Sequence, residues 1–316
     1  MLGPGMLMMW IAGSLAASMI LGMPPLLALL VGAVLTPTDP VLSVPVVSGT
    51  LAHEAVPTDM RHALTAESAG NDGLALPIVM IPVLLLTTSI GHAASQWVLD
   101  AVLWQLTLAI AIGGAAGWLA GHCHSWARAQ SHADESSLLT ISIALSVTTL
   151  AALQVLGGNG VVGAFVAGAV FNESLAGSDE AGHERFTEAL SRFFDLPVMI
   201  LFGAVLPWGI WSALGWRGCA FAIAVLAFRR MPAWLLLRRW IPWSRTLPQV
   251  LFAGWFGPVG VAALFYACDA QLRTGSPVLW PVISLVCAMS VVAHGVTGTH
   301  LSALLGRLRS PERSSR

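Results

Sequence analysis

The sequence predicts an all-α, polytopic membrane protein with about ten transmembrane helices in an inverted repeat, in which two discontinuous helices cross. Of the 316 residues, 56% are hydrophobic and only 10% are charged, and the mean hydropathy is +0.77. Apolar stretches long enough to cross a bilayer recur along the chain. Two of these stretches are interrupted by proline or glycine motifs, a pattern that marks a binding site at the middle of a membrane.

Composition also limits the partners and cofactors. The formal net charge is −1, so we expect no nucleic-acid partner. The four cysteines lack C-x-x-C spacing, which favours small packing residues over disulfides or metal ligands. The run His122-Cys123-His124 could suggest a metal site, but we prefer a cluster at a helix end because no further ligand follows nearby. We therefore expect no cofactor and no resident metal.

The membrane spans follow from the apolar windows of the sequence. In chain order these windows are 6–23, 26–47, 63–88, 97–121, 137–156, 160–171, 196–214, 218–237, 249–267 and 278–305. Pro24-Pro25 ends the first helix, because proline is not tolerated in a helix interior. Four residues that include three glycines, 157–160, precede the short helix that begins at 160, and a polar loop follows over 172–192.

The arginines indicate how these spans are oriented. With ten spans, eleven of the 15 arginines fall on the side that contains both termini, and two fall on the other side. Because cytoplasmic loops carry excess Arg and Lys, we expect both termini in the cytoplasm. Residues 1–305 would form the membrane domain, and 306–316 would form a basic cytoplasmic tail. The other two arginines, Arg229 and Arg230, fall inside the predicted helix 218–237.

The first interrupted stretch has Thr36-Pro37-Thr38-Asp39-Pro40 at its centre. Each proline removes a backbone donor and clashes with the preceding turn, so we expect two half-helices joined by unwound backbone. Unwound backbone at membrane depth is tolerated inside protein or beside a water-filled cavity. Freed carbonyl groups with one carboxylate, Asp39, could remove water from a cation there.

The next apolar stretch carries Glu67, Ser68, Asn71 and Asp72. A carboxylate in hydrocarbon costs roughly 2.5–3.5 kcal/mol, so an intramembrane acid indicates function. Helical spacing places Ser68 and Asp72 on one face, which we expect to look toward Asp39. Glu67 and Asn71 share another face. A buried arginine also needs a partner, so we expect Glu67 to pair with Arg229 or Arg230.

A second interruption lies at Gly257-Pro258-Val259-Gly260, within the window 249–267. With ten spans, this helix and the first interrupted helix run in opposite directions. A pair of interrupted helices with inverted topology is the strongest sequence indication of a secondary-transporter binding site. His294, in the last span, is predicted to be a packing residue, with a proton relay as the alternative.

These stretches resemble a known family, the monovalent cation:proton antiporters of the sodium/proton exchanger group. The matching motifs are TPTDPV (36–41), AESAGNDGLAL (66–76), GGNGVVGAFVAG (157–168), AFRRMP (227–232), GWFGPVGVA (254–262) and SVVAHGVTG (290–298). They span nearly the whole chain in the family's order. Glu-Ser-x-x-Asn-Asp after Thr-Asp-Pro is the specific combination; the glycine stretches alone would be weak.

The resemblance implies roles for individual residues. Asp72 would alternate between a proton and a cation. Asp39 and Ser68 would supply further oxygen ligands, and Thr38 would contribute its backbone. Asn71, where electrogenic relatives carry a second Asp, implies electroneutral exchange. Glu67 would pair with Arg230 in preference to Arg229.

The resemblance also implies the activity, which is transport and not enzymatic catalysis. The expected function is exchange of Na⁺ (or K⁺ or Li⁺) for H⁺ by alternating access, in a homodimer within the lipid bilayer of a cell (inner) membrane. Two departures matter: Val259 stands where the family usually has Arg, and the chain begins at what corresponds to the fourth family helix. A truncated, non-transporting remnant is therefore an alternative. An intramembrane aspartyl protease, with Asp39 and Asp72 as a dyad, is a distant one.

Overall fold

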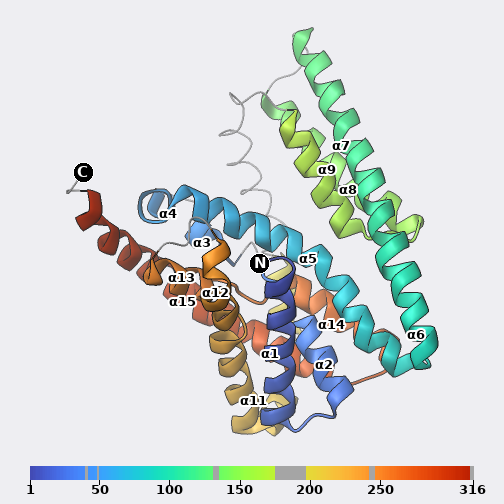
Figure 1. Cartoon of the computed structure of the whole chain (residues 1–316), viewed down its shortest axis with the longest axis vertical. Helices are drawn as coiled ribbons and strands as arrows, with labels where there is room; N and C mark the ends of the chain where they lie inside the picture. Colours follow the sequence, from blue (N-terminus) through green and yellow to red (C-terminus); the bar gives the residue numbers. More distant parts are fainter. Residues whose placement is uncertain (40–41, 48–49, 131–134, 175–196, 242–245, 314–316) are drawn as a thin grey trace. The chain divides into compact units, whose positions relative to one another are not determined.

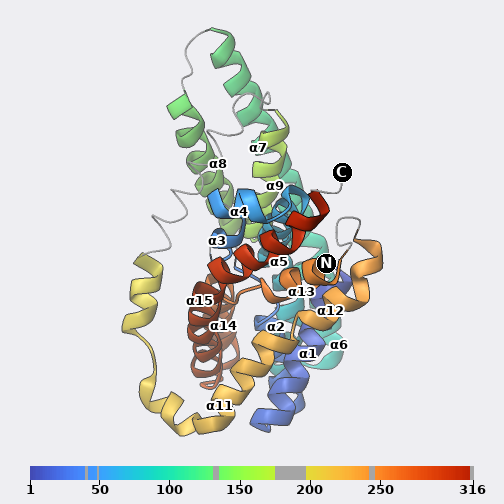
Figure 2. The same cartoon turned by 90° about the vertical axis from the view of Figure 1, so that its left-hand side faces the viewer.

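The computed structural model describes residues 1–39, 42–47, 50–130, 135–174, 197–241 and 246–313. Within these ranges every regular element is a helix, which confirms the all-α prediction (Figures 1 and 2). The chain divides into two compact units. One comprises Met1–Thr88 with Phe202–Arg316, and the other comprises Ser89–Leu201.

The first unit begins with two closely packed helices, α1 (Pro4–Leu21) and α2 (Pro25–Val34), which lie side by side in Figure 1. Gly22 ends α1 in a left-handed conformation (φ 68°), as glycine commonly does after a helix. The backbones of the two helices approach at Gly13 and Gly32, where a side chain on either residue would meet the opposite helix. The indole Nε1 of Trp10 donates to the carbonyl oxygen of Leu29 at 2.8 Å.

The segment after α2 is not helical as far as residue 39, and two short helices follow, α3 (Val44–Val47) and α4 (Thr50–Ala55). The structure therefore has the interruption expected at Pro37. Pro40 lies outside the described residues. The long helix α5 (Thr58–Thr87) comes next and carries the acidic motif. It contains Pro77 and Pro82 in its C-terminal half.

The structure differs from the sequence prediction between 197 and 237. The predicted helices 196–214 and 218–237 are replaced by a helix over 197–204, then α11 (Trp208–Phe228), kinked at Gly215, and α12 (Met231–Leu237). Arg229 and Arg230 therefore lie at a junction between helices and not inside one. Pro232 explains the junction. It is accommodated in the first turn of α12, whereas in a continuous helix its ring would clash with the carbonyl of residue 228. A single 3₁₀ turn, η2 (Arg238–Trp240), follows α12.

The last part of the first unit contains the second interruption. Helix α13 (Leu247–Trp255) and helix α14 (Val261–Thr274) are separated by the non-helical residues 256–260, as the sequence predicts. Helix α15 (Leu279–Arg313) then packs beside α14 and α11 (Figure 2). It extends beyond the predicted end at 305 into the predicted tail, where arginines with good helix propensity follow.

An apolar cluster joins the helices of the first unit around the interruptions. It includes Met60 of α5, Trp234 of α12 and Phe252 of α13, together with Phe256 and Leu305, all of them buried. Burying a large apolar side chain contributes about 1.5–3 kcal/mol, so this cluster fixes α5, α12 and α13 around the second break.

The second unit consists of α6 (Ile90–Gln96), the π-helix η1 (Trp97–Trp104), α7 (Gln105–Ala129), α8 (Glu135–Val155) and α9 (Gly160–Glu173). Helices α7 and α9 pack closely along a row of small residues. A Cβ on Gly113 or Gly117 would overlap the backbone of α9 at Gly163 or Ala167. Close backbone approach through small residues is the usual way in which membrane helices associate.

Five helical stretches of the described residues are long and apolar enough to cross a membrane: Pro4–Leu21, Thr58–Thr87, Ile90–Ala129, Trp208–Trp240 and Leu279–Leu308. Shorter apolar helices cover Pro25–Val34, Thr140–Val155 and Gly160–Glu173. Many large apolar side chains on these helices are exposed, among them Met19, Ile110 and Ile223. Such side chains suit hydrocarbon as their surroundings, as in a polytopic membrane protein.

Candidate functional site

The two interrupted segments meet in the first unit. The backbone N–H of Asp39, in the first break, donates to the carbonyl oxygen of Pro258, in the second break, at 2.9 Å. The sequence placed the breaks 220 residues apart, and the fold brings their unwound backbones into direct contact. Each break thus satisfies part of the other's backbone hydrogen bonding, which unwound backbone at membrane depth requires.

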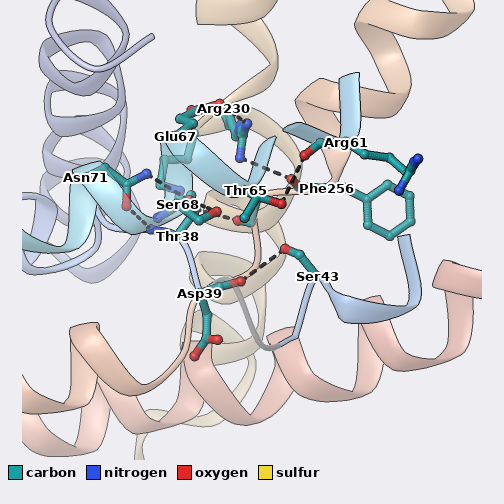
Figure 3. Close-up of polar contacts among 12 residues, drawn as sticks. Thr38, Asp39, Ser43, Arg61, Thr65, Glu67, Ser68, Asn71, Arg230 and Phe256 are labelled. Carbon is teal, nitrogen blue, oxygen red and sulfur yellow. Dashed lines mark hydrogen bonds and ion pairs between the residues drawn. The ribbon is translucent and has the colours of Figure 1, made fainter. Parts of the chain in front are cut away.

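The carboxylate of Asp39 accepts hydrogen bonds from two backbone N–H groups. Its Oδ2 accepts from the N–H of Val261 at 2.7 Å, and its Oδ1 accepts from the N–H of Leu42 at 3.2 Å. Val261 is the first residue of α14, so Asp39 acts as an N-cap supplied from a distant segment. Gly260 permits this approach, because a Cβ there would overlap the carboxylate. In Figure 3 this carboxylate points away from Thr38 and Ser68.

Three polar side chains form a buried cluster beside the first break (Figure 3). The amide oxygen of Asn71 accepts from the backbone N–H of Thr38 at 3.0 Å, and the amide nitrogen donates to the Thr38 hydroxyl at 2.8 Å. The hydroxyls of Thr38 and Ser68 are 3.0 Å apart. Asn71, expected to share a face of α5 with Glu67, thus contacts the first break through both ends of its amide. Both Ser68 and Asn71 contact Thr38, because residues three apart on a helix are neighbours on its surface.

Glu67, one turn before Asn71 on α5, lies against Arg230. The Nη2 of Arg230 donates to Oε2 of Glu67 at 2.6 Å, and its Nη1 donates to the carbonyl oxygen of Phe256 at 3.1 Å. Both charged side chains are buried. A Cβ on Gly257 would overlap the Arg230 guanidinium, so glycine is needed for this packing. The pair joins α5 to the second break through the junction between α11 and α12.

Arg229 bonds to backbone and not to Glu67. Its Nη1 donates to the carbonyl oxygens of Leu35 and Pro37, the latter at 3.2 Å. Its Nη2 donates to the carbonyl oxygen of Gly257 at 2.7 Å. Leu35 follows the last residue of α2, and Gly257 lies two residues after α13, so one guanidinium bonds near the C-terminal ends of both half-helices. A cation is favourable at helix C-termini because of the orphan carbonyls and the helix dipole.

Asp72 lies one turn beyond Ser68 on α5. Its Oδ1 is buried and has no hydrogen-bond partner among the described residues. It lies within electrostatic range of Asp39. Its backbone carbonyl oxygen accepts a hydrogen bond from the hydroxyl of Tyr266, on α14, at 2.5 Å. The acid that the resemblance implied as the exchanging group thus has a buried carboxylate oxygen without a hydrogen bond among the described residues. Oε1 of Glu67 is also without one, but the other oxygen of that carboxylate is paired with Arg230.

The structure adds two residues that sequence reasoning did not single out, Tyr266 and Ser290. The Ser290 hydroxyl accepts from the N–H of Val259 at 2.8 Å and lies 3.2 Å from Nδ1 of His294. The Nε2 of His294 lies 3.0 Å from the carbonyl oxygen of Trp255, the last residue of α13. Ser290 and His294, both on α15, thus contact the backbone at the second break and at the end of α13. Ser290 and His294 are four residues apart and therefore share one face of the helix. This spacing is the sequence signal from which their contact could have been predicted.

Comparison with known proteins agrees with this arrangement. A family model described as "Sodium/hydrogen exchanger, transmembrane" matches residues 1–304. The chain belongs to the sodium/hydrogen exchanger family. This match includes both breaks and every residue of the cluster described above, and it identifies the chain as a multi-pass membrane protein.

Several fungal proteins are similar to this chain over most of its length. The Na(+)/H(+) antiporter of Schizosaccharomyces pombe is 29% identical over 307 residues, covering 90% of this chain and 65% of the relative. Na(+)/H(+) antiporter 2 of Zygosaccharomyces rouxii is 28% identical, with coverages of 85% and 37%. The Na(+)/H(+) antiporter of Saccharomyces cerevisiae is 27% identical, with coverages of 88% and 32%. The chain thus spans between about a third and two thirds of the length of these relatives.

Proposed function

We propose that this member of the exchanger family exchanges a monovalent cation, Na⁺ (or K⁺ or Li⁺), for H⁺, with Asp72 as the group that binds each in turn. The observation that carries the proposal is the buried, unpartnered carboxylate oxygen of Asp72 beside two interrupted helices. A buried carboxylate oxygen without a hydrogen bond is costly, and a proton or a cation would relieve that cost.

The surrounding donors favour a hard cation. The hydroxyls of Thr38 and Ser68 are oxygen donors from the first break and from α5. The carboxylate of Asp39 is a further oxygen donor of the first break, although it points away from these hydroxyls. Oxygen ligands suit alkali cations, whereas soft metals prefer thiolates or imidazoles. Asp39 already accepts two backbone N–H groups, so it would contact a cation through its remaining lone pairs. Asn71 is bonded to Thr38 through both ends of its amide, and we assign it to support.

The finer features of the proposal follow the family resemblance and the arginine distribution. They comprise ten spans in an inverted repeat, alternating access about the crossing, electroneutral stoichiometry and a homodimer. They also include a cell-membrane location with both termini in the cytoplasm. The buried Arg229 and Arg230 both contact the second break, which supports a functional crossing despite Val259 at the position where the family usually has Arg.

Cation-driven proton flux in proteoliposomes tests the proposal. We expect an imposed Na⁺ or K⁺ gradient to drive proton movement, reported by a pH-sensitive dye, with the wild-type chain. Asp72→Asn should reduce the flux to that of empty liposomes. Asp59→Asn, an exposed acid in the first turn of the same helix, is the matched control and should retain exchange. Full exchange by Asp72→Asn, or no flux with the wild-type chain, would contradict the proposal.

A further inference from the structure

The single tyrosine of the chain lies buried between α14 and α5. Tyr266 is 2% exposed, and its hydroxyl donates to the backbone carbonyl oxygen of Asp72 at 2.5 Å. This contact joins the second interrupted helix to the turn of α5 that carries the exchanging carboxylate. It is made to the backbone, so it fixes the position of the turn and leaves the Asp72 side chain available to an ion.

The same helix also contacts the other acidic residue. At its first residue, the N–H of Val261 donates to Oδ2 of Asp39 at 2.7 Å. Tyr266 follows five residues later, about 7.5 Å along the helix axis. Helix α14 therefore contacts Asp39 at its end and the Asp72 turn on its side. A helix of 14 residues is stiff over this length, so the two contacts relate the positions of the acids.

We propose that Tyr266 is a positioning residue for the cation site, and that through it α14 sets the separation between the carboxyl groups of Asp39 and Asp72. The inference rests on the proposed function, because it concerns the affinity of the same site. Oxygen ligands bind an alkali cation well only at a fixed separation, so loss of the hydroxyl weakens cation binding without removing any ligand.

A purely structural role for Tyr266 makes a different prediction. If the Tyr266 hydrogen bond contributes only to stability, its loss would destabilise the cation-free protein and leave cation affinity unchanged. The two roles are therefore separated by measuring the apparent KM for the cation together with the melting temperature in the presence and absence of cation.

The test compares Tyr266→Phe with the wild-type chain in proteoliposomes and in detergent. We expect the apparent KM for Na⁺ or K⁺ to rise about fivefold, with turnover at saturating cation changed less than twofold. The rise in melting temperature produced by NaCl or KCl over choline chloride should be smaller in the variant. Thr274→Val is the matched control, because its hydroxyl also lies on α14 but bonds to Ala270 and Ser276, at the far end of that helix. It should leave both readouts at wild-type values.

Two outcomes would overturn the inference. One is a Tyr266→Phe variant whose KM and cation-dependent melting shift equal those of the wild-type chain. The other is a lower melting temperature without cation and an unchanged KM, which would assign Tyr266 to packing. Absence of exchange by the wild-type chain would instead overturn the proposed function, and the melting shift with cation would still test Tyr266.

Discussion

The carboxylate of Asp39 accepts a hydrogen bond from the backbone N–H of Val261 at 2.7 Å, although 222 residues separate them in the chain. A residue expected to be an ion ligand thus also caps the second half of the other interrupted helix. The contact gives Asp39 a structural role that can be separated from any contact with a cation.

The first prediction concerns this cap. Asp39→Ala removes the acceptor for Val261 and Leu42 and should lower the free energy of unfolding by about 1–2 kcal/mol, as N-cap removal does elsewhere. Asp39→Asn retains an acceptor oxygen and should lose less. The measurement is the melting temperature of the purified chain in detergent without alkali cations. Equal stability of Asp39→Ala and the wild-type chain would show that the cap is unimportant.

A second prediction concerns the close approach at Gly260. In Gly260→Ala the added methyl group would overlap the Asp39 carboxylate, so this carboxylate must leave the N–H of Val261 or the two breaks must move apart. We expect loss of cation-driven proton flux and a lower melting temperature. Gly295→Ala is the matched control, since a Cβ at that helical glycine has no heavy atom within 4 Å beyond the neighbouring backbone of its own helix. Wild-type flux from Gly260→Ala would argue against contact between Asp39 and α14.

The third prediction concerns the buried ion pair between Glu67 and Arg230. Removing one partner leaves a buried charge uncompensated, so Glu67→Leu and Arg230→Met should each destabilise the protein by roughly 3–5 kcal/mol. The double variant leaves neither charge and should be more stable than either single variant. Melting temperatures of the four proteins form a double-mutant cycle. Additive losses would mean that the two side chains do not interact.

The fourth prediction concerns the second unit. Gly117→Ala would place a methyl group against the Ala167 backbone and should force α7 and α9 apart. Gly114→Ala, on the same helix but with open space at its Cβ, should be neutral or slightly stabilising, since alanine favours helix. Limited proteolysis of the two variants should show faster cleavage for Gly117→Ala alone. Equal cleavage rates would contradict the packing described here.

Much of this arrangement could be predicted from local sequence. Pro37 and Gly257-Pro258 indicate the two breaks because they remove or weaken backbone hydrogen bonds, and Glu67 demands a basic partner because it is an acid in an apolar stretch. The contact of Asn71 with Thr38 could not be predicted, because helical spacing assigns faces but not the neighbour that each face meets. Tyr266 was missed for the same reason, since nothing local distinguishes a tyrosine that reaches a distant carbonyl.

The three carbonyl contacts of Arg229 restrict how the protein can move. The guanidinium of Arg229 is hydrogen-bonded to Leu35, Pro37 and Gly257 and so joins both unwound segments. Separating these segments would leave the buried Arg229 charge without hydrogen bonds. In the proposed exchange cycle we therefore expect the two unwound segments to move together as one rigid piece. Access to either side of the bilayer would then open at the periphery of that piece, where its helices slide against their neighbours.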